Sequence, residues 1–197
     1  MLVSFLHQNN DEKFFERERN MKYCELAEIY MWCRHLTRIF PRHLQNKPNK
    51  NAIMSTSAAD ISKLEEVVAF WATIDKKKKF TKDPEFDFLL INKYADLHSD
   101  LMAGVYDSLL ESSPMPGLLG AVLVLDQFSR NMFRGSAKSF ASDAKALSLA
   151  KQAMDNGSYQ EAGDSKEWFY LPFMHSEEMS DQKLCVQYFT SSSWVSC

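Results

Sequence analysis

The apolar run at residues 118–125 constrains the fold of this chain more than any other feature of its sequence. The run reads Leu-Leu-Gly-Ala-Val-Leu-Val-Leu, and Pro116-Gly117 stands just before it, where a helix can begin. A helix that is apolar on every side has no face for water, so we expect it at the centre of the domain. The run is far shorter than the roughly 20 residues that span a bilayer, so we expect a soluble protein without a membrane partner.

Two further helices are predicted before this run. Residues 57–60 resemble a capping box, and apolar residues with helical spacing follow them. Asp83-Pro84 is a typical helix start, and Gly104 is a typical helix end about twenty residues later. The lysine run at residues 76–79 lies between these two helices, and we expect it to form a solvated loop.

Three further helices are predicted after the run. The first covers residues 140–154 and ends at Asn156-Gly157, a pair that favours a left-handed helix terminus. The second begins near Ser165 and is interrupted by Pro172. Ser176 caps the third, with Glu177-Glu178 in its first turn. No alternating strand pattern competes with these segments, so the predicted fold class is all-α.

The first 53 residues differ in charge from the rest of the chain. Residues 1–53 carry a formal charge of +3, whereas residues 54–197 carry −6. We expect an N-terminal extension over residues 1–53, with one possible helix and a linker, and then a helical domain over 54–189. The net charge of −3 gives no reason to expect nucleic acid as a partner.

The cysteines indicate a reducing compartment. The chain has four, none of them in a C-x-x-C motif, and they lie near its two ends. Neither a disulfide framework nor a zinc ribbon is supported by this spacing. The predicted location is therefore the cytoplasm, with an organelle as the alternative because the N-terminal extension is basic.

Polar residues follow the apolar run directly and form the first part of a candidate site. Asp126, Arg130 and Arg134 are spaced four residues apart, which predicts that they share one helical face, and Gln127 and Asn131 form a second such pair. One interpretation is an Asp126–Arg130 bridge with the other side chains capping nearby backbone. The other is an anion site, because two arginines at this spacing can bind a carboxylate or phosphate.

His175 and Glu178 form the second part of the candidate site. They are three residues apart, a spacing at which histidine and carboxylate can share a metal, act as an acid–base pair or form a structural hydrogen bond. No second metal-binding motif accompanies them, and the chain has no Walker loop, dinucleotide fingerprint or H-E-x-x-H. We therefore predict no metal and no cofactor.

Four strings in the sequence are long enough to compare with known families: V-V-A-F-W at 67–71, K-D-P-E-F-D at 82–87, L-D-Q-F-S-R-N-M-F-R-G at 125–135 and Y-L-P-F-M-H-S-E at 170–177. The last two contain every residue of the candidate site except Glu178. On these strings the chain resembles domain-of-unknown-function family 924 over residues 64–189. The resemblance implies an all-α fold of stacked antiparallel helical hairpins, related to tetratricopeptide repeats.

The resemblance also exposes a departure at the C-terminus. Family members continue with a helix that carries a basic, aromatic motif resembling H-R-x-x-I-x-x-F-G-R-F-P-H-R-N. Residues 190–197 of this chain do not resemble that motif. We therefore expect them to be a tail outside the family domain, and we expect a C-terminally truncated member that lacks part of any polar site in the family.

Two function classes remain open from the sequence. The first is a binding scaffold whose polar groove holds a protein, a peptide or a small anionic ligand. The second is a small enzyme or metal-dependent hydrolase that uses His175 with nearby carboxylates. A third reading is that the polar strings only lock the packing of the helices. The distance between His175 and Asp126 separates these readings, because a composite site requires the two residues to meet.

Overall fold

The computed structural model describes residues 60–113 and 115–191, and within them it contains helices and no strands. The all-α prediction is thus confirmed, whereas the relation to tetratricopeptide repeats stays a prediction. Residues 1–59 and 192–197, with the predicted extension, linker and tail, lie outside the described residues. The elements are α3 (Ile61–Thr73), α4 (Lys76–Phe80), α5 (Pro84–Ala103), α6 (Asp107–Leu110), α7 (Met115–Val122), η1 (Leu123–Phe128), α8 (Ser129–Met132), η2 (Ala137–Phe140), α9 (Asp143–Asp155), η3 (Ser158–Lys166), α10 (Glu167–His175) and α11 (Met179–Ser191).

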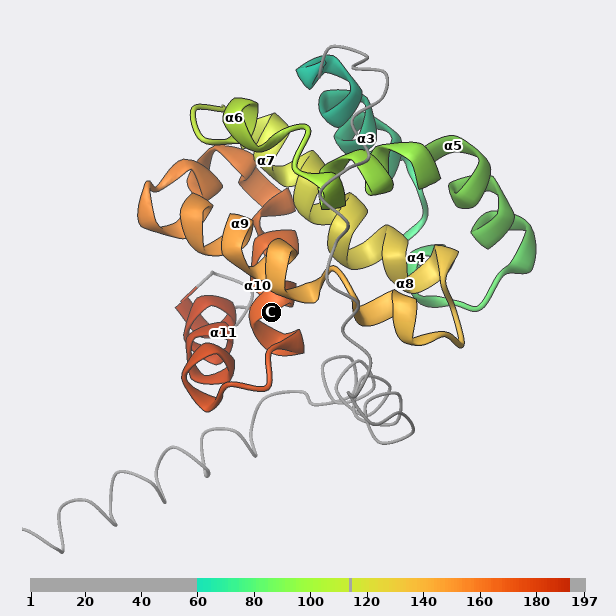
Figure 1. Ribbon diagram of the computed structural model, residues 1–197. Helices are drawn as coiled ribbons and strands as arrows, with labels where there is room; N and C mark the ends of the chain where they lie inside the picture. Colours follow the sequence, from blue (N-terminus) through green and yellow to red (C-terminus); the bar gives the residue numbers. More distant parts are fainter. Residues whose placement is uncertain (1–59, 114, 192–197) are drawn as a thin grey trace, which may run out of the picture. The chain divides into compact units, whose positions relative to one another are not determined.

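The apolar run forms the centre of the described helices, as predicted. The segments α7, η1 and α8 follow one another without a break, and every residue from Gly117 to Met132 is buried. Helices α3 and α9 pack on α7, while α5 packs on η1 and α8. Figure 1 shows this central helix in yellow and gold, with α5 on one side and α9 and α10 on the other.

Local capping signals set the helix ends on the N-terminal side. Asp83 Oδ1 accepts hydrogen bonds from the backbone N–H groups of Glu85 and Phe86, and Pro84 occupies the first turn of α5. Gly104 ends α5 in a left-handed conformation with φ of 84°. Both ends of α5 thus lie where the sequence predicts them. Helix α3 is capped by Asp60, whose side chain accepts a hydrogen bond from the backbone N–H of Ser62. Ser57, the other end of the predicted capping box, lies outside the described residues.

Three predicted boundaries differ in the structure. Residues 76–79 form part of the short helix α4 instead of a loop, because Asp75 Oδ1 accepts hydrogen bonds from two backbone N–H groups and caps them. Helix α10 runs through the buried Pro172 to His175 instead of being interrupted there. Helix α11 begins at Met179, so the glutamates at 177 and 178 precede its first turn.

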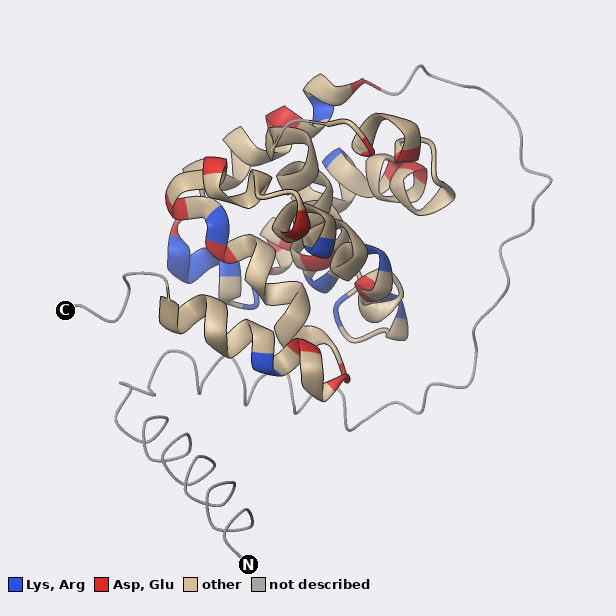
Figure 2. Ribbon diagram, turned by 90° about the vertical axis from the view of Figure 1, so that its left-hand side faces the viewer, with Lys and Arg blue, Asp and Glu red and all other residues tan. Residues whose placement is uncertain are grey.

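The surface of the described residues carries charges of both signs. In the view of Figure 2, Lys or Arg positions and Asp or Glu positions are interspersed over the helices. No helix among residues 60–113 and 115–191 is long and apolar enough to cross a membrane.

Candidate functional site

The candidate site is built on a change of winding in the central helix. Residues Leu123–Phe128 form a π-helix, which is rare and is often found at functional sites. The carbonyl oxygen of Leu125 accepts hydrogen bonds from the hydroxyl groups of Ser129 (2.7 Å) and Ser142 (2.6 Å). These two side chains stabilise the π-helix and hold the start of α9 against it.

Asp126 and His175 meet inside the protein although they are 49 residues apart. His175 Nδ1 lies 2.6 Å from Asp126 Oδ1, and the two side chains are only 7% and 1% exposed. Asp126 comes from the π-helix, and His175 is the last residue of α10. Gln127 donates a hydrogen bond to the other carboxylate oxygen of Asp126. The structure therefore brings His175, from the second part of the predicted site, to Asp126 and Gln127 from the first part.

The pKa of Asp126 results from two opposing effects. Burial alone raises the pKa of this carboxyl, but the charge and hydrogen bond of His175, with Arg130 and Gln127, lower it below 3.8. Asp126 is thus ionised at neutral pH. An ionised carboxylate can only accept a hydrogen bond, so Nδ1 of His175 must carry a proton in order to donate to Asp126. In the neutral imidazole, Nε2 is then the unprotonated, basic nitrogen.

Arg130 connects Asp126 to a second carboxylate, that of Asp143. Its Nη2 lies 3.0 Å from Asp143 Oδ2 and 3.8 Å from Asp126 Oδ1, and its Nη1 donates to the carbonyl oxygen of Ser139 (3.0 Å). The guanidinium also stacks on the ring of Phe140, 4.6 Å from the ring centroid. This buried arginine holds α8, η2 and α9 together around the site.

The carboxyl of Asp143 has a raised pKa. Burial raises its pKa to about 6, Arg130 and His175 oppose this rise, and the negative charge of Asp126 adds to it. The sequence gives little signal for this residue, because it lies at the start of a helix where aspartate is common. Its role in the site follows from the fold alone.

Among the buried polar side-chain atoms that have no hydrogen-bond partner in the described part of the chain, three belong to Arg130 and to residues next to it in sequence or in space. They are Arg130 Nε, Asn131 Nδ2 and Asp143 Oδ1. A buried polar group without a partner costs about 1–3 kcal/mol, so such atoms are normally satisfied by water or by a ligand. Two of the three are donors, which a carbonyl or carboxylate oxygen would satisfy.

Two predicted site residues lie apart from this cluster. Helix α8 ends at Met132, so Arg134 leaves the helical face and forms a two-point ion pair with Asp87 on α5 (2.8 and 3.0 Å). Glu178 is exposed in the turn before α11, where its backbone N–H donates to Ser176 Oγ. The two arginines are each paired with carboxylates and do not converge on one anion.

No metal centre accompanies the cluster in the part of the chain that the structure describes. Within residues 60–113 and 115–191, no group of three or more His, Cys, Asp or Glu side chains is placed to hold a metal ion.

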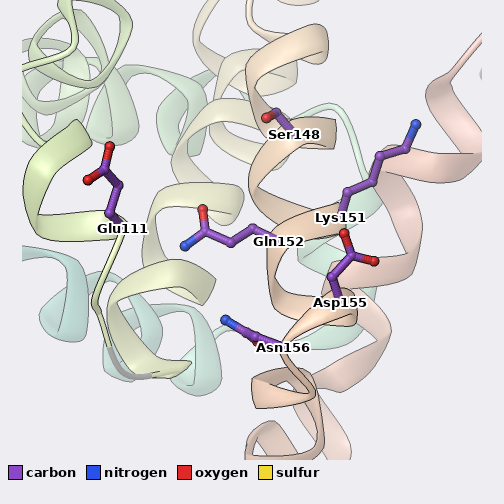
Figure 3. Close-up of a pocket in the computed structure, with 6 residues that line it drawn as sticks. All are labelled: Glu111, Ser148, Lys151, Gln152, Asp155 and Asn156. Atoms are coloured by element: carbon purple, nitrogen blue, oxygen red, sulfur yellow. The ribbon is translucent and has the colours of Figure 1, made fainter.

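A shallow polar groove lies elsewhere, between α9 and the segment after α6. It has a volume of about 630 Å³, and Figure 3 shows Gln152 pointing from α9 toward the side of Glu111. Lys151 is already paired with Asp181 of α11 (2.7 Å). The groove is lined by Glu111, Ser148, Lys151, Gln152, Asp155 and Asn156, none of which belongs to the buried cluster.

Comparisons with known proteins place the chain in a family. The family model described as "Bacterial protein of unknown function (DUF924)" matches residues 67–194, which extends past residue 189. A solved structure of a protein of unknown function from Agrobacterium tumefaciens is similar, with a TM-score of 0.63 and 33% sequence identity. The match covers 67% of this chain and 75% of that chain. No curated protein matches the chain significantly. The chain thus belongs to the DUF924 family.

Proposed function

We propose that the buried cluster is an acid–base site in which His175 exchanges a proton with a small polar substrate. The observation that carries this proposal is the 2.6 Å contact between His175 Nδ1 and the buried Asp126 carboxylate. In this role Asp126 positions the imidazole and stabilises its protonated form, so that Nε2 can accept a proton and return it. The proposal is the enzyme alternative of the two function classes, without a commitment to a metal.

The energetics of burial support a chemical role for the cluster. Two aspartates, an arginine and a histidine are largely removed from water here. Replacing buried ion pairs by apolar residues of similar volume is often neutral or stabilising, so packing alone does not require them. Shifted pKa values around a buried charge partner are typical of functional sites, and Asp143 shows such a shift.

The unpartnered atoms indicate which substrates suit this site. Arg130 Nε and Asn131 Nδ2 are donors without a described acceptor, and both side chains are more than nine-tenths buried. A carbonyl or carboxylate oxygen of a substrate would satisfy either donor. Arg130 would then position the substrate while His175 moves the proton, and Asp126 would act only through His175.

Nitrogen NMR of the full chain tests the geometry that this proposal requires. With ¹⁵N-labelled histidine, neutral His175 should show a protonated Nδ1 and an unprotonated Nε2, and Asp126→Asn should alter this state. His98 is the matched control, because its Nε2 contacts the hydroxyl of Ser142 instead of a carboxylate (3.3 Å). A neutral His175 with its proton on Nε2 would contradict the proposal.

Thermal unfolding with a panel of small carboxylates, amides and phosphate esters tests the function. A ligand at 100 times its dissociation constant stabilises a protein by about 2.7 kcal/mol, which is a shift of several degrees. We expect at least one compound to stabilise the wild-type chain and His98→Gln but not His175→Gln. An equal shift in all three proteins would place binding away from His175 and refute the proposal.

The shallow groove beside α9 supports a second candidate function, that of a binding scaffold. Lys151 is neutralised by Asp181, so Glu111 and Asp155 give the groove an excess of negative charge. A basic peptide would fit this charge. Titration of Asp155→Asn and wild-type chains with a labelled lysine-rich peptide tests the idea, and equal binding by both would exclude the groove.

A further inference from the structure

A buried hydrogen-bond network connects His98 of α5 to the backbone directly before Asp126. His98 Nε2 lies 3.3 Å from the hydroxyl oxygen of Ser142, and this hydroxyl donates to the carbonyl oxygen of Leu125 at 2.6 Å. Ser142 is fully buried and His98 is only 8% exposed, so both groups are shielded from water. The network joins three elements, because α5 and α9 both pack on the π-helix that contains Leu125.

The single proton of the Ser142 hydroxyl fixes the direction of each bond in this network. That proton is used at Leu125, whose oxygen is the nearer of the two partners. Ser142 Oγ therefore accepts at its other contact, and Nε2 of His98 donates. Burial lowers the pKa of His98, so its imidazole is neutral at neutral pH. Neutral His98 thus carries its proton on Nε2, which is the opposite of the tautomer inferred for His175.

The hydroxyl of Ser142 does not make the bond that is usual for its position. Ser142 is the N-cap residue of α9, where a serine side chain normally accepts a hydrogen bond from a backbone N–H of the first turn, but here it makes no such bond. Its hydroxyl bonds to His98 and Leu125 instead. Such departures from a local preference are typical of functional sites.

The carbonyl group of Leu125 belongs to the same rigid peptide unit as the backbone N–H of Asp126. The two groups lie in one plane because the peptide bond does not rotate freely. Holding the Leu125 oxygen therefore holds the backbone from which the Asp126 side chain extends. The hydroxyl of Ser129 donates to the same oxygen at 2.7 Å and lies 3.1 Å from the carbonyl oxygen of Asp126. Both peptide units that flank Asp126 are thus in contact with buried hydroxyl groups.

We propose that His98 is a positioning residue for Asp126. By donating to Ser142 Oγ, it directs the serine proton to the π-helix and keeps the Asp126 carboxylate in place for His175. Without this donor, the buried Oγ has no partner for its lone pairs, and its bond to Leu125 weakens because neighbouring hydrogen bonds polarise one another. The consequence for proton transfer rests on the proposed function, whereas the geometry can be tested without a substrate.

NMR of the full chain with ¹⁵N-labelled histidine tests the role of His98. Neutral His98 should carry its proton on Nε2. In His98→Leu, the Nδ1 proton of His175 should exchange with water about two- to tenfold faster, the factor that corresponds to one buried hydrogen bond. His98→Gln should restore the wild-type rate, because its side-chain amide can donate to Ser142 in place of the imidazole. Ser142→Ala should accelerate exchange as much as His98→Leu, and the double variant should exchange no faster than either.

Leu97→Ala is the matched control for a general loss of stability. Leu97 precedes His98 on α5 and is also 8% exposed, so its truncation should lower the unfolding midpoint without changing the exchange at His175. Equal acceleration in Leu97→Ala and His98→Leu, or a neutral His98 with its proton on Nδ1, would overturn the proposal. A His175 protonated on Nδ1 that does not respond to His98→Leu would refute the positioning role alone. A wild-type His175 protonated on Nε2 would overturn the proposed function as well.

Discussion

Gly120 provides the most direct test of how the central helix packs. A Cβ atom at this position would lie 2.7 Å from the carbonyl carbon and 2.9 Å from the Cα of Leu64, and closer still to the carbonyl oxygen. These are backbone atoms of α3, which cannot rotate away. Carbon atoms normally pack at about 3.5–4.0 Å, so Gly120→Ala requires α3 to move by about 1 Å.

The size of the effect follows from the contacts that this shift loosens. Overpacking costs about 1–3 kcal/mol, and partial exposure of Leu64 and Val67, which are fully buried on α3, adds about 2 kcal/mol. The higher helix propensity of alanine offsets about 1 kcal/mol. We therefore expect Gly120→Ala to lower the free energy of unfolding by about 2–4 kcal/mol, measured by urea unfolding with far-ultraviolet circular dichroism.

Gly117→Ala is the matched control on the same helix. Its added Cβ would meet Ile61 Cδ1 at 2.6 Å and the hydroxyl of Ser113, both at the ends of side chains that can change rotamer. The gain in helix propensity is the same, so we expect a change within about 1 kcal/mol of wild type. If Gly120→Ala is as stable as Gly117→Ala, then α3 and α7 do not approach each other as the structure shows.

Three further predictions concern the charged side chains. The pKa of Asp143 is raised from 3.8 to about 6, so the folded protein binds this proton more tightly than the unfolded chain does. The free energy of unfolding should therefore fall by up to about 3 kcal/mol as pH rises from 4 to above 6. Asp143→Asn should remove this slope in unfolding measurements across that range. The pKa of Asp126 is lowered instead, so its ionised carboxylate stabilises the fold above pH 4, and this stabilisation is lost as pH falls. Asp126→Asn should be less stable than wild type at pH 7 and should not show this loss of stability in acid. Arg134→Ala should reduce the free energy of unfolding by about 1–2 kcal/mol, because it removes the ion pair with Asp87. The double variant Arg134→Ala/Asp87→Ala should lose less stability than the sum of the losses in the two single variants, which would confirm that the two side chains are coupled.

Local chemistry explains which parts of the fold could be predicted from the sequence. The ends of α5 depend on Asp83, Pro84 and Gly104, each of which acts within a few residues of its own position. The burial of the central helix follows from its uniformly apolar composition. The lysine run was predicted wrongly as a loop because one aspartate, Asp75, supplies a cap that outweighs the repulsion within the run.

The candidate site was only partly predictable, because the central helix does not keep the regular α-helical winding that the spacing argument assumes. The prediction that Asp126, Arg130 and Arg134 share a face assumes 3.6 residues per turn through residue 134. The π-helix changes the winding at Asp126, and the helix ends at Met132, so Arg134 pairs with Asp87 instead. The partners Ser139 and Asp143 could not be predicted, since only the packing of η2 and α9 brings them to Arg130.

The buried cluster and the π-helix are best understood together. A π-helix is less stable than an α-helix of the same length, and burying Asp126, Arg130 and His175 adds a desolvation penalty. An apolar α-helix would fill the same space without either cost. Both unfavourable features coincide at Asp126, where the π-helix presents its carboxylate to the imidazole of His175 at 2.6 Å. This coincidence favours a site that is kept for its proton chemistry over one that is kept only to lock helix packing.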